Sequence, residues 1–170
     1  MNKLEKTLRL IIPLLNNGNY QYHITGGFAA HLYGSERPVN DIDLALPQQD
    51  FLRFSNELKR FVIDGPRRFT VAPRDLWLTE LKIDDQLIDL SGDESARVLD
   101  KNTKSWVPIS ENFESAVKIE QFGLSLMVQN PLELMSYKRI ISWNGDDLKH
   151  LADVEAIERW VRNNRKLCCD

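Results

Sequence analysis

The stretch Ile24-Thr25-Gly26-Gly27-Phe28, followed after a connector by Asn40-Asp41-Ile42-Asp43-Leu44, decides how this chain folds. An apolar strand signal ends at the two glycines, and a helical run of small residues over 28–33 follows them. The chain then enters a second strand, which carries Asp41 and Asp43 and turns apolar at once. Because side chains alternate along a strand, both acids lie on one face, with their α-carbons about 6.6 Å apart.

Two carboxylates beside a glycine turn and a helix N-terminus favour one function, the binding of a metal ion together with a phosphate. The acids hold a divalent metal ion, while backbone N–H groups of the turn and the helix dipole hold an anionic phosphate. The alternative is an ordinary strand–turn–helix whose strand exposes two solvated acids. Aspartate is disfavoured in strands, so two in one strand, each beside Ile or Leu, favour the functional interpretation.

The order Gly26-Gly27, helix, Gly34-Ser35, Arg37 and then Asp41-Ile42-Asp43-Leu44 resembles the signature of the polymerase-beta-like nucleotidyltransferase superfamily. It is most similar to small stand-alone members: lincosamide and aminoglycoside nucleotidyltransferases, and the nucleotidyltransferase toxins of abortive-infection and toxin–antitoxin systems. The resemblance covers residues 20–92 well and the C-terminal third more loosely. It implies an α+β fold, in which helices flank a mixed β-sheet and a helical pair closes the C-terminus.

Asp89 is the candidate for a third acid in the same site. Residues 77–83 and 86–90 predict a hairpin around Asp84-Asp85, and its second strand is apolar except for Asp89 and its first residue. Taken alone, this acid also fits a strand end on the solvent side. The superfamily places its third carboxylate on a later strand beside the Asp-x-Asp strand, so the resemblance implies that Asp89 joins the first two.

The resemblance also implies a chemistry for the site. Asp41, Asp43 and Asp89 would hold Mg²⁺, as two ions, and the reaction would move a nucleoside monophosphate from a nucleoside triphosphate (NTP) to an acceptor hydroxyl, releasing pyrophosphate. The acceptor stays open between a small molecule, an RNA end and a protein. The residues expected to hold the nucleotide are Gly26, Gly27, Ser35, Arg37 and Lys138.

Lys138 belongs to the looser, C-terminal part of the resemblance. A helix that starts near Pro131 resembles the Pro-x-x-Leu-x-x-x-Lys helix of these proteins, whose lysine faces the nucleotide phosphates. A surface lysine with a buried stem explains this residue equally well. The following helix departs from the family's Lys-Asp-x-x-Asp pattern at His150, which leaves open whether Asp153 orients Lys138. Val39 is a second departure, since Thr is common there.

Composition indicates one domain over residues 1–170, with a catalytic core over about 18–92 and a C-terminal completion over about 113–165. A formal net charge of −3 offers no overall attraction for nucleic acid. The sequence shows no signal-peptide pattern and no stretch long enough for a membrane span. Cys168 and Cys169 are adjacent and cannot form a set of disulfide bonds that stabilises the fold, so a reducing, cytoplasmic setting is expected.

The other segments predict a packing framework of helices, turns and short strands. Arg67-Arg68 could touch a phosphate, but such a pair is more often a solvated face. The last helix is expected to turn five apolar residues inward: Leu148, Leu151, Val154, Ile157 and Val161. The remaining predictions are helices over 3–16 and 48–62, a turn at 64–66, a strand over 69–72, an irregular excursion over 93–112, and strands over 116–119 and 124–128.

Three functions compete at this stage. The first is the active nucleotidyltransferase, and the second is a degenerate relative that keeps the fold as a binding or partner protein. The third is a metal-dependent phosphohydrolase that uses the same acids on a phosphate ester. Retention of all three acids and the Gly-Gly turn favours the first function over the second. The absence of a nucleophile motif around Asp41 argues against the third. A protein partner or a homodimer stays open.

Overall fold

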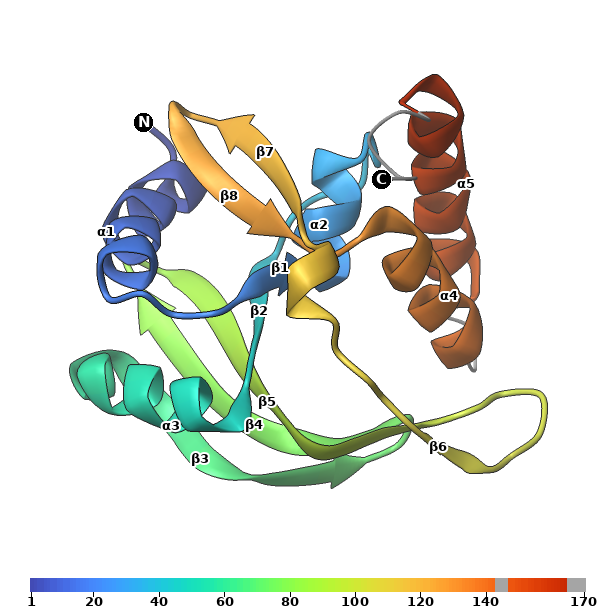
Figure 1. The fold of residues 1–170 in the computed structure, drawn as a ribbon, viewed down its shortest axis with the longest axis horizontal. Coiled ribbons are helices and arrows are strands. Elements are labelled where there is room, and N and C mark those ends of the chain that lie inside the picture. The colour runs from blue at the N-terminus through green and yellow to red at the C-terminus, as the bar shows by residue number, and fades with distance from the viewer. Residues whose placement is uncertain (143–146, 165–170) are drawn as a thin grey trace.

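The computed structural model is organised around one mixed β-sheet, with helices at two ends of it (Figure 1). Within the described residues, 1–142 and 147–164, eight strands join this sheet in the order β3-β4-β5-β2-β1-β8-β7, and β6 pairs with β5. The strands are β1 (His23–Thr25), β2 (Asp41–Leu46), β3 (Val62–Val71), β4 (Arg74–Ile83), β5 (Gln86–Leu99), β6 (Trp106–Pro108), β7 (Val117–Gln121) and β8 (Leu124–Val128).

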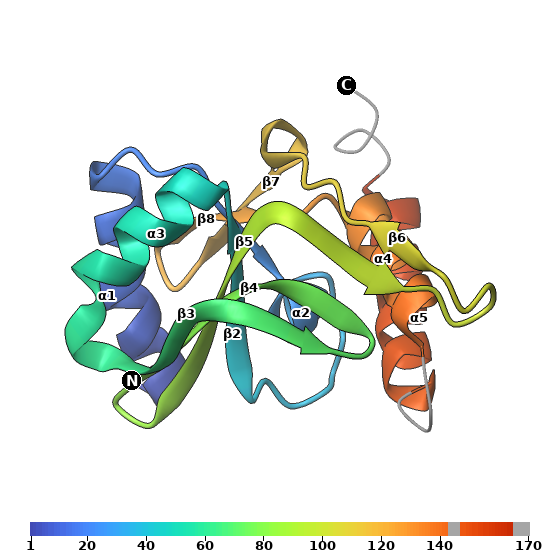
Figure 2. The same ribbon diagram turned by 90° about the horizontal axis from the view of Figure 1, so that it is seen from below.

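The helices form two groups, which Figure 2 shows from below. Helices α1 and α3 lie together at one end of the molecule, and the C-terminal pair α4 and α5 lies at the other, with α2 between this pair and the central strands. The helices are α1 (Lys3–Asn17), α2 (Gly26–Leu32), α3 (Gln48–Glu57), α4 (Pro131–Ile141) and α5 (Asp147–Asn163), with 3-10 turns η1 (Lys59–Phe61) and η2 (Phe113–Ser115). The predicted fold class is confirmed.

The hydrophobic core follows from the two periodicities of the sequence. Helix α1 buries a stripe at helical spacing that includes Leu8, Ile11 and Leu15, each with no exposed surface. Strand β2 becomes fully buried after its acids, from Leu44 to Leu46. These side chains meet Phe51 and the rest of the α3 stripe in one continuous cluster. This packing fixes β2, and therefore the two acids at its start, at the centre of the sheet.

Two strands run longer than the sequence predicts. The predicted turn at 64–66 is wrong, because β3 continues through it with register shifts and keeps its pairing to β4. The excursion predicted over 93–112 is wrong in its first part, where residues 93–99 extend β5. Both extensions are held by backbone pairing to neighbours: Val98 lies opposite Arg74 on β4 and Val107 on β6. Such pairing depends on strands distant in sequence.

Helix α5 turns a different face inward than its leucines indicate. Val154 and Ile157 are buried as predicted, but Leu148 and Leu151 are 81% and 45% exposed. Asp153 takes an inward position instead, because polar side chains from α4 and the α2–β2 connector bind it there. The sequence also predicts that Asn144-Gly145 ends the helix that starts near Pro131, and that Asp146 or Asp147 caps the last helix. These predictions, and the one on Cys168-Cys169, concern residues or side chains outside the described part of the chain.

None of the helices in the described ranges combines the length and the apolarity needed to cross a membrane.

Candidate active site

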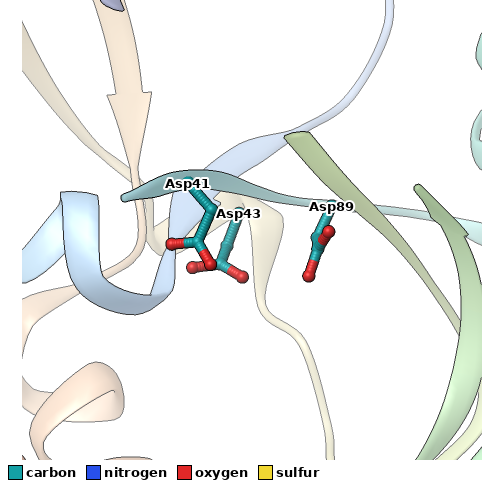
Figure 3. Close-up of side chains that lie close together, drawn as sticks. All are labelled: Asp41, Asp43 and Asp89. Carbon is teal, nitrogen blue, oxygen red and sulfur yellow. The ribbon is translucent and has the colours of Figure 1, made fainter. Parts of the chain in front are cut away.

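Three carboxylates from two parallel strands converge at the centre of the sheet (Figure 3). Strand β2 pairs in parallel with β5, and the register sets Asp43 opposite Asp89. Alternation puts Asp41 on the same face of β2 as Asp43. One carboxylate oxygen from each of the three residues lies within 4.8 Å of the others. Such a set of hard oxygen donors fits Mg²⁺, which binds carboxylates and keeps several waters.

We call Asp41, Asp43 and Asp89 the triad; burial and repulsion between carboxylates raise the pKa of two of its members, Asp43 and Asp89. Burial, followed by the charges of Asp41 and Asp89, raises the pKa of Asp43 to about 7. Burial, followed by the charges of Asp41 and Glu80, raises the pKa of Asp89 to about 6. Carboxylates this close resist full ionisation until a cation joins them. The pair of raised values therefore supports a cation-binding role.

Gly26 lets Asp43 approach the start of α2. Helix α2 begins at the two glycines themselves, two residues earlier than predicted. Gly26 has a φ of +65°, and a Cβ built there would lie 1.8 Å from Asp43 Oδ2. The Gly27 N–H donates to the same oxygen at 3.4 Å. At position 27 a Cβ would meet nothing within 4 Å, so the steric demand falls on Gly26 alone.

The predicted nucleotide-binding side chains are joined by Asp153. Its Oδ1 accepts a hydrogen bond from Ser35 Oγ at 2.7 Å. Its Oδ2 accepts one from an Arg37 guanidinium nitrogen at 2.6 Å and one from Lys138 Nζ at 2.8 Å. Asp153 has no exposed surface, and Lys138 is only 3% exposed. The orientation of Lys138 by Asp153, which the sequence left open, is present in the structure.

A cavity of about 370 Å³ opens over the triad, and we call it the cleft. Of the predicted nucleotide-binding residues, Gly26, Gly27, Arg37 and Lys138 line it. Ser35 does not, because its hydroxyl is turned to Asp153 behind them. Burial lowers the pKa of the Lys138 ammonium, while Asp153 and Asp43 act to raise it. The His150 imidazole, at the position where the resemblance expects Asp, also lines the cleft.

Neither member of the Arg67-Arg68 pair lines the cleft. Arg67 donates to Asp64 within β3. Arg68 binds Asp75 at 2.6 Å and two backbone carbonyls of β5. Arg67 also lies 3.7 Å from Glu80 on β4, so both guanidinium groups contact a neighbouring strand and belong to the framework of the sheet.

Sequence reasoning missed several charged or polar residues that line the cleft, among them Arg74, Glu111 and Tyr137. Burial raises the pKa of the Tyr137 phenol to about 12, with smaller effects from Arg74, Asp43 and Glu111. Glu111 lies 2.9 Å from the buried imidazole of His23. The position of Tyr137 directly before Lys138 was a usable signal. Arg74 and Glu111 had none, because they lie outside the strands predicted from alternation.

No protein-family profile matches the chain, and no curated protein matches it in sequence. Solved structures do match its fold. TM1012 from Thermotoga maritima, classed with the nucleotidyltransferases, superposes with a TM-score of 0.68 at 20% identity, over 96% of this chain and 97% of its own. The antibiotic adenylyltransferase LnuA, solved with lincomycin bound, gives 0.55 at 13% identity, over 93% and 97% of the chains.

A third neighbour is ANT(2″)-Ia, solved in complex with adenylyl-2″-tobramycin. It gives a TM-score of 0.57 at 14% identity, over 97% of this chain and 98% of its own. These matches span nearly the whole of each chain. They show that this chain has the nucleotidyltransferase fold, as the resemblance implies.

Proposed function

We propose that residues 1–170 form one Mg²⁺-dependent nucleotidyltransferase domain, which transfers a nucleoside monophosphate from an NTP to an acceptor hydroxyl. The observation that carries the proposal is the convergence of Asp41, Asp43 and Asp89 within 4.8 Å, in a cleft lined by Gly26 and Lys138. A set of three oxygen donors on one side and cationic and N–H groups on the other suits a metal-bound triphosphate. The shared fold agrees with this assignment.

In this proposal Asp41 and Asp43 would hold the Mg²⁺ ions together with Asp89, which would lie on the side of the acceptor. Bound there, the metal would supply charge neutralisation and Lewis acidity, which lowers the pKa of the acceptor hydroxyl. Asp89, on the acceptor side of the cleft, would accept the hydroxyl proton. The acceptor oxygen forms a bond to the α-phosphorus, and the bond from that phosphorus to the bridging oxygen breaks.

The leaving pyrophosphate needs positive charge that does not have to be rearranged during the reaction. Arg37 and Lys138 provide it, because Asp153 holds both in place. Backbone N–H groups at Gly26 and Gly27 would add further donors, once the Asp43 carboxylate turns from the Gly27 N–H to a metal ion. Phosphoryl-group transfer depends mainly on such positioning and charge stabilisation.

The experiment is to incubate the protein with Mg²⁺, each α-labelled NTP and pools of candidate acceptors, and to follow the label and the released phosphate. We expect pyrophosphate release that requires both Mg²⁺ and an acceptor, with the label transferred to that acceptor. Release of inorganic phosphate without label transfer would instead identify a phosphohydrolase. NTP binding with no release of either product would identify a degenerate binding protein.

A further inference from the structure

The cleft has a second half, beyond Asp89, that differs from the side of the glycines. Strand β4 pairs with β5 on the side away from β2, so residues of β4 flank Asp89 opposite the nucleotide-binding groups. The side chains that line the cleft here are largely apolar: Ala72, Pro73, Leu76, Leu78 and Ile109. Leu76 and Leu78 belong to a separate small hydrophobic cluster, which includes Ile109. We call this half the apolar shelf.

Arg74 lines the cleft at the apolar shelf, and no carboxylate of the described residues forms a salt bridge with it. Its guanidinium lies 5.7 Å from the centre of the Phe69 ring. Across residues 1–142 and 147–164, the Arg74 side chain forms no hydrogen bond or salt bridge. It is nevertheless close enough to Asp43 and Asp89 for its charge to lower the pKa of both. Arg37 and Lys138 differ, because each is already bound to Asp153.

We propose that Arg74 and the apolar shelf bind an acceptor that carries a phosphate group on an apolar or aromatic body. This inference rests on the proposed function, because it takes Asp89 to mark the acceptor side of the cleft. A guanidinium offers two parallel N–H donors that match phosphate oxygens, and it keeps its charge at every working pH. The body of the acceptor would cover Leu76 and Leu78, which already face the cleft.

The same charge disfavours the opposite class of acceptor. An acceptor amine placed on the apolar shelf would lie beside the Arg74 guanidinium. Like-charge contact in a partly buried site costs affinity rather than adding to it. A phosphorylated acceptor is therefore favoured over one that presents an amine to Arg74.

Three matched probes test this assignment: phenyl phosphate, benzyl alcohol and benzylamine. Each is titrated by calorimetry into protein already saturated with Mg²⁺ and a non-hydrolysable ATP analogue, so that Arg37 and Lys138 are occupied. We expect phenyl phosphate to bind the wild type most tightly and Arg74→Gln at least about tenfold more weakly, the scale of one charge-assisted hydrogen bond. Arg74→Lys, which keeps the charge, should recover part of the loss.

Arg60→Gln is the matched control, because Arg60 also lies against a phenylalanine ring, 4.5 Å from Phe61, but away from the cleft. It should leave phenyl phosphate binding unchanged, and benzyl alcohol should not distinguish Arg74→Gln from the wild type. The inference is overturned if the wild type does not bind phenyl phosphate, if Arg74→Gln binds it as tightly, or if benzylamine binds better.

The outcome is separable from that of the proposed function. Suppose that pyrophosphate release requires an acceptor, but that phenyl phosphate binds equally well with and without Arg74. The proposed transferase function would then stand, and the acceptor assignment would be wrong. Arg74-dependent binding in a protein that releases no pyrophosphate would retain an anion site and remove both the transferase and the acceptor assignment.

Discussion

The two halves of the cleft differ in whether their basic side chains form salt bridges with the protein. On the side of the glycines, Arg37 and Lys138 are bound to the buried carboxylate of Asp153. On the side of β4, Arg74 faces the triad with an aromatic ring as its neighbour, and among the described residues it forms no salt bridge. Asp41, Asp43 and Asp89 lie between the two halves.

This difference suggests how one cleft can bind two kinds of ligand: one that is the same in every turnover and one that differs between substrates. Cations fixed by a buried acid lose little freedom on binding, so they suit a group that is the same in every turnover, here a triphosphate. A cation on an apolar surface that is not bound to an acid of the protein, as Arg74 is not, can form its ion pair with the ligand instead. The proposed function therefore assigns the nucleotide to the first half of the cleft, and the further inference assigns the acceptor to the second.

The largest effect is expected from Asp153→Ala, which removes the acid that fixes the first half. Lys138 is 3% exposed and would be left as a buried charge without its partner. Breaking a buried pair in this way costs about 3–5 kcal/mol in the free energy of unfolding. Chemical denaturation measures this loss, with Glu155→Ala, an exposed acid on the same helix, as control. A loss below about 1 kcal/mol, equal to that of the control, would show that Asp153 does not hold the cations.

The next effect is at the centre of the cleft. Asp43→Asn should slow turnover at least about a hundredfold, or about 2.7 kcal/mol, the scale of losing one key electrostatic stabiliser. Its melting temperature should not fall, because the change also removes repulsion from Asp41 and Asp89. Asp85→Asn on the β4–β5 turn, whose side chain is 84% exposed, is the control for the substitution itself. Wild-type turnover in Asp43→Asn would remove the site assignment.

A smaller effect separates the two glycines. Gly26→Ala places a Cβ on Asp43 Oδ2 and requires an alanine at a φ of +65°. The backbone conformation alone costs about 1–2 kcal/mol, and displacement of the Asp43 carboxylate should weaken metal binding as well. Gly27→Ala, with open space at its Cβ, should fold as stably as the wild type. Equal melting temperatures for the two variants would contradict this account of Gly26.

The smallest effect is the pH dependence of metal binding. The pKa of Asp43 is raised to about 7, so a proton competes with Mg²⁺ below that pH and not above it. Affinity should be constant above about pH 8 and should fall by about tenfold per pH unit between pH 7 and pH 6. Below pH 6 it should fall more steeply, because Asp89 also binds a proton there. Calorimetry in two buffers of different ionisation enthalpy should show proton release on binding near pH 6. Affinity independent of pH from 5 to 8 would contradict the raised pKa.

The centre of the cleft was predicted in two different ways. Alternation places Asp41 and Asp43 on one face, whereas Asp89 was expected beside them only because of the family resemblance, and the structure pairs it with Asp43. The partnership of Ser35, Arg37 and Lys138 through Asp153 depends on how α5 packs against α2 and α4. The family resemblance suggested part of this network, the link between Asp153 and Lys138, but the spacing of residues in the sequence predicts none of it.

The acceptor half could not be predicted for the same reason. Residues 93–99 are a strand because β4 and β6 pair with them, and Arg74 reaches the triad from a strand whose start the alternation signal did not reveal. On α5, periodicity separates two faces but does not say which lies inward. The rule that apolar residues are buried selected the face of Leu148 and Leu151, whereas the cleft required the polar face of His150 and Asp153.

The most direct measurement is anomalous diffraction from crystals soaked with Mn²⁺ and a non-hydrolysable NTP analogue. The account predicts two anomalous peaks about 3.5–4 Å apart, both bounded by carboxylate oxygens of Asp41 and Asp43, and one of them also by Asp89. Peaks elsewhere on the protein, with none among these three residues while the analogue is bound, would contradict it.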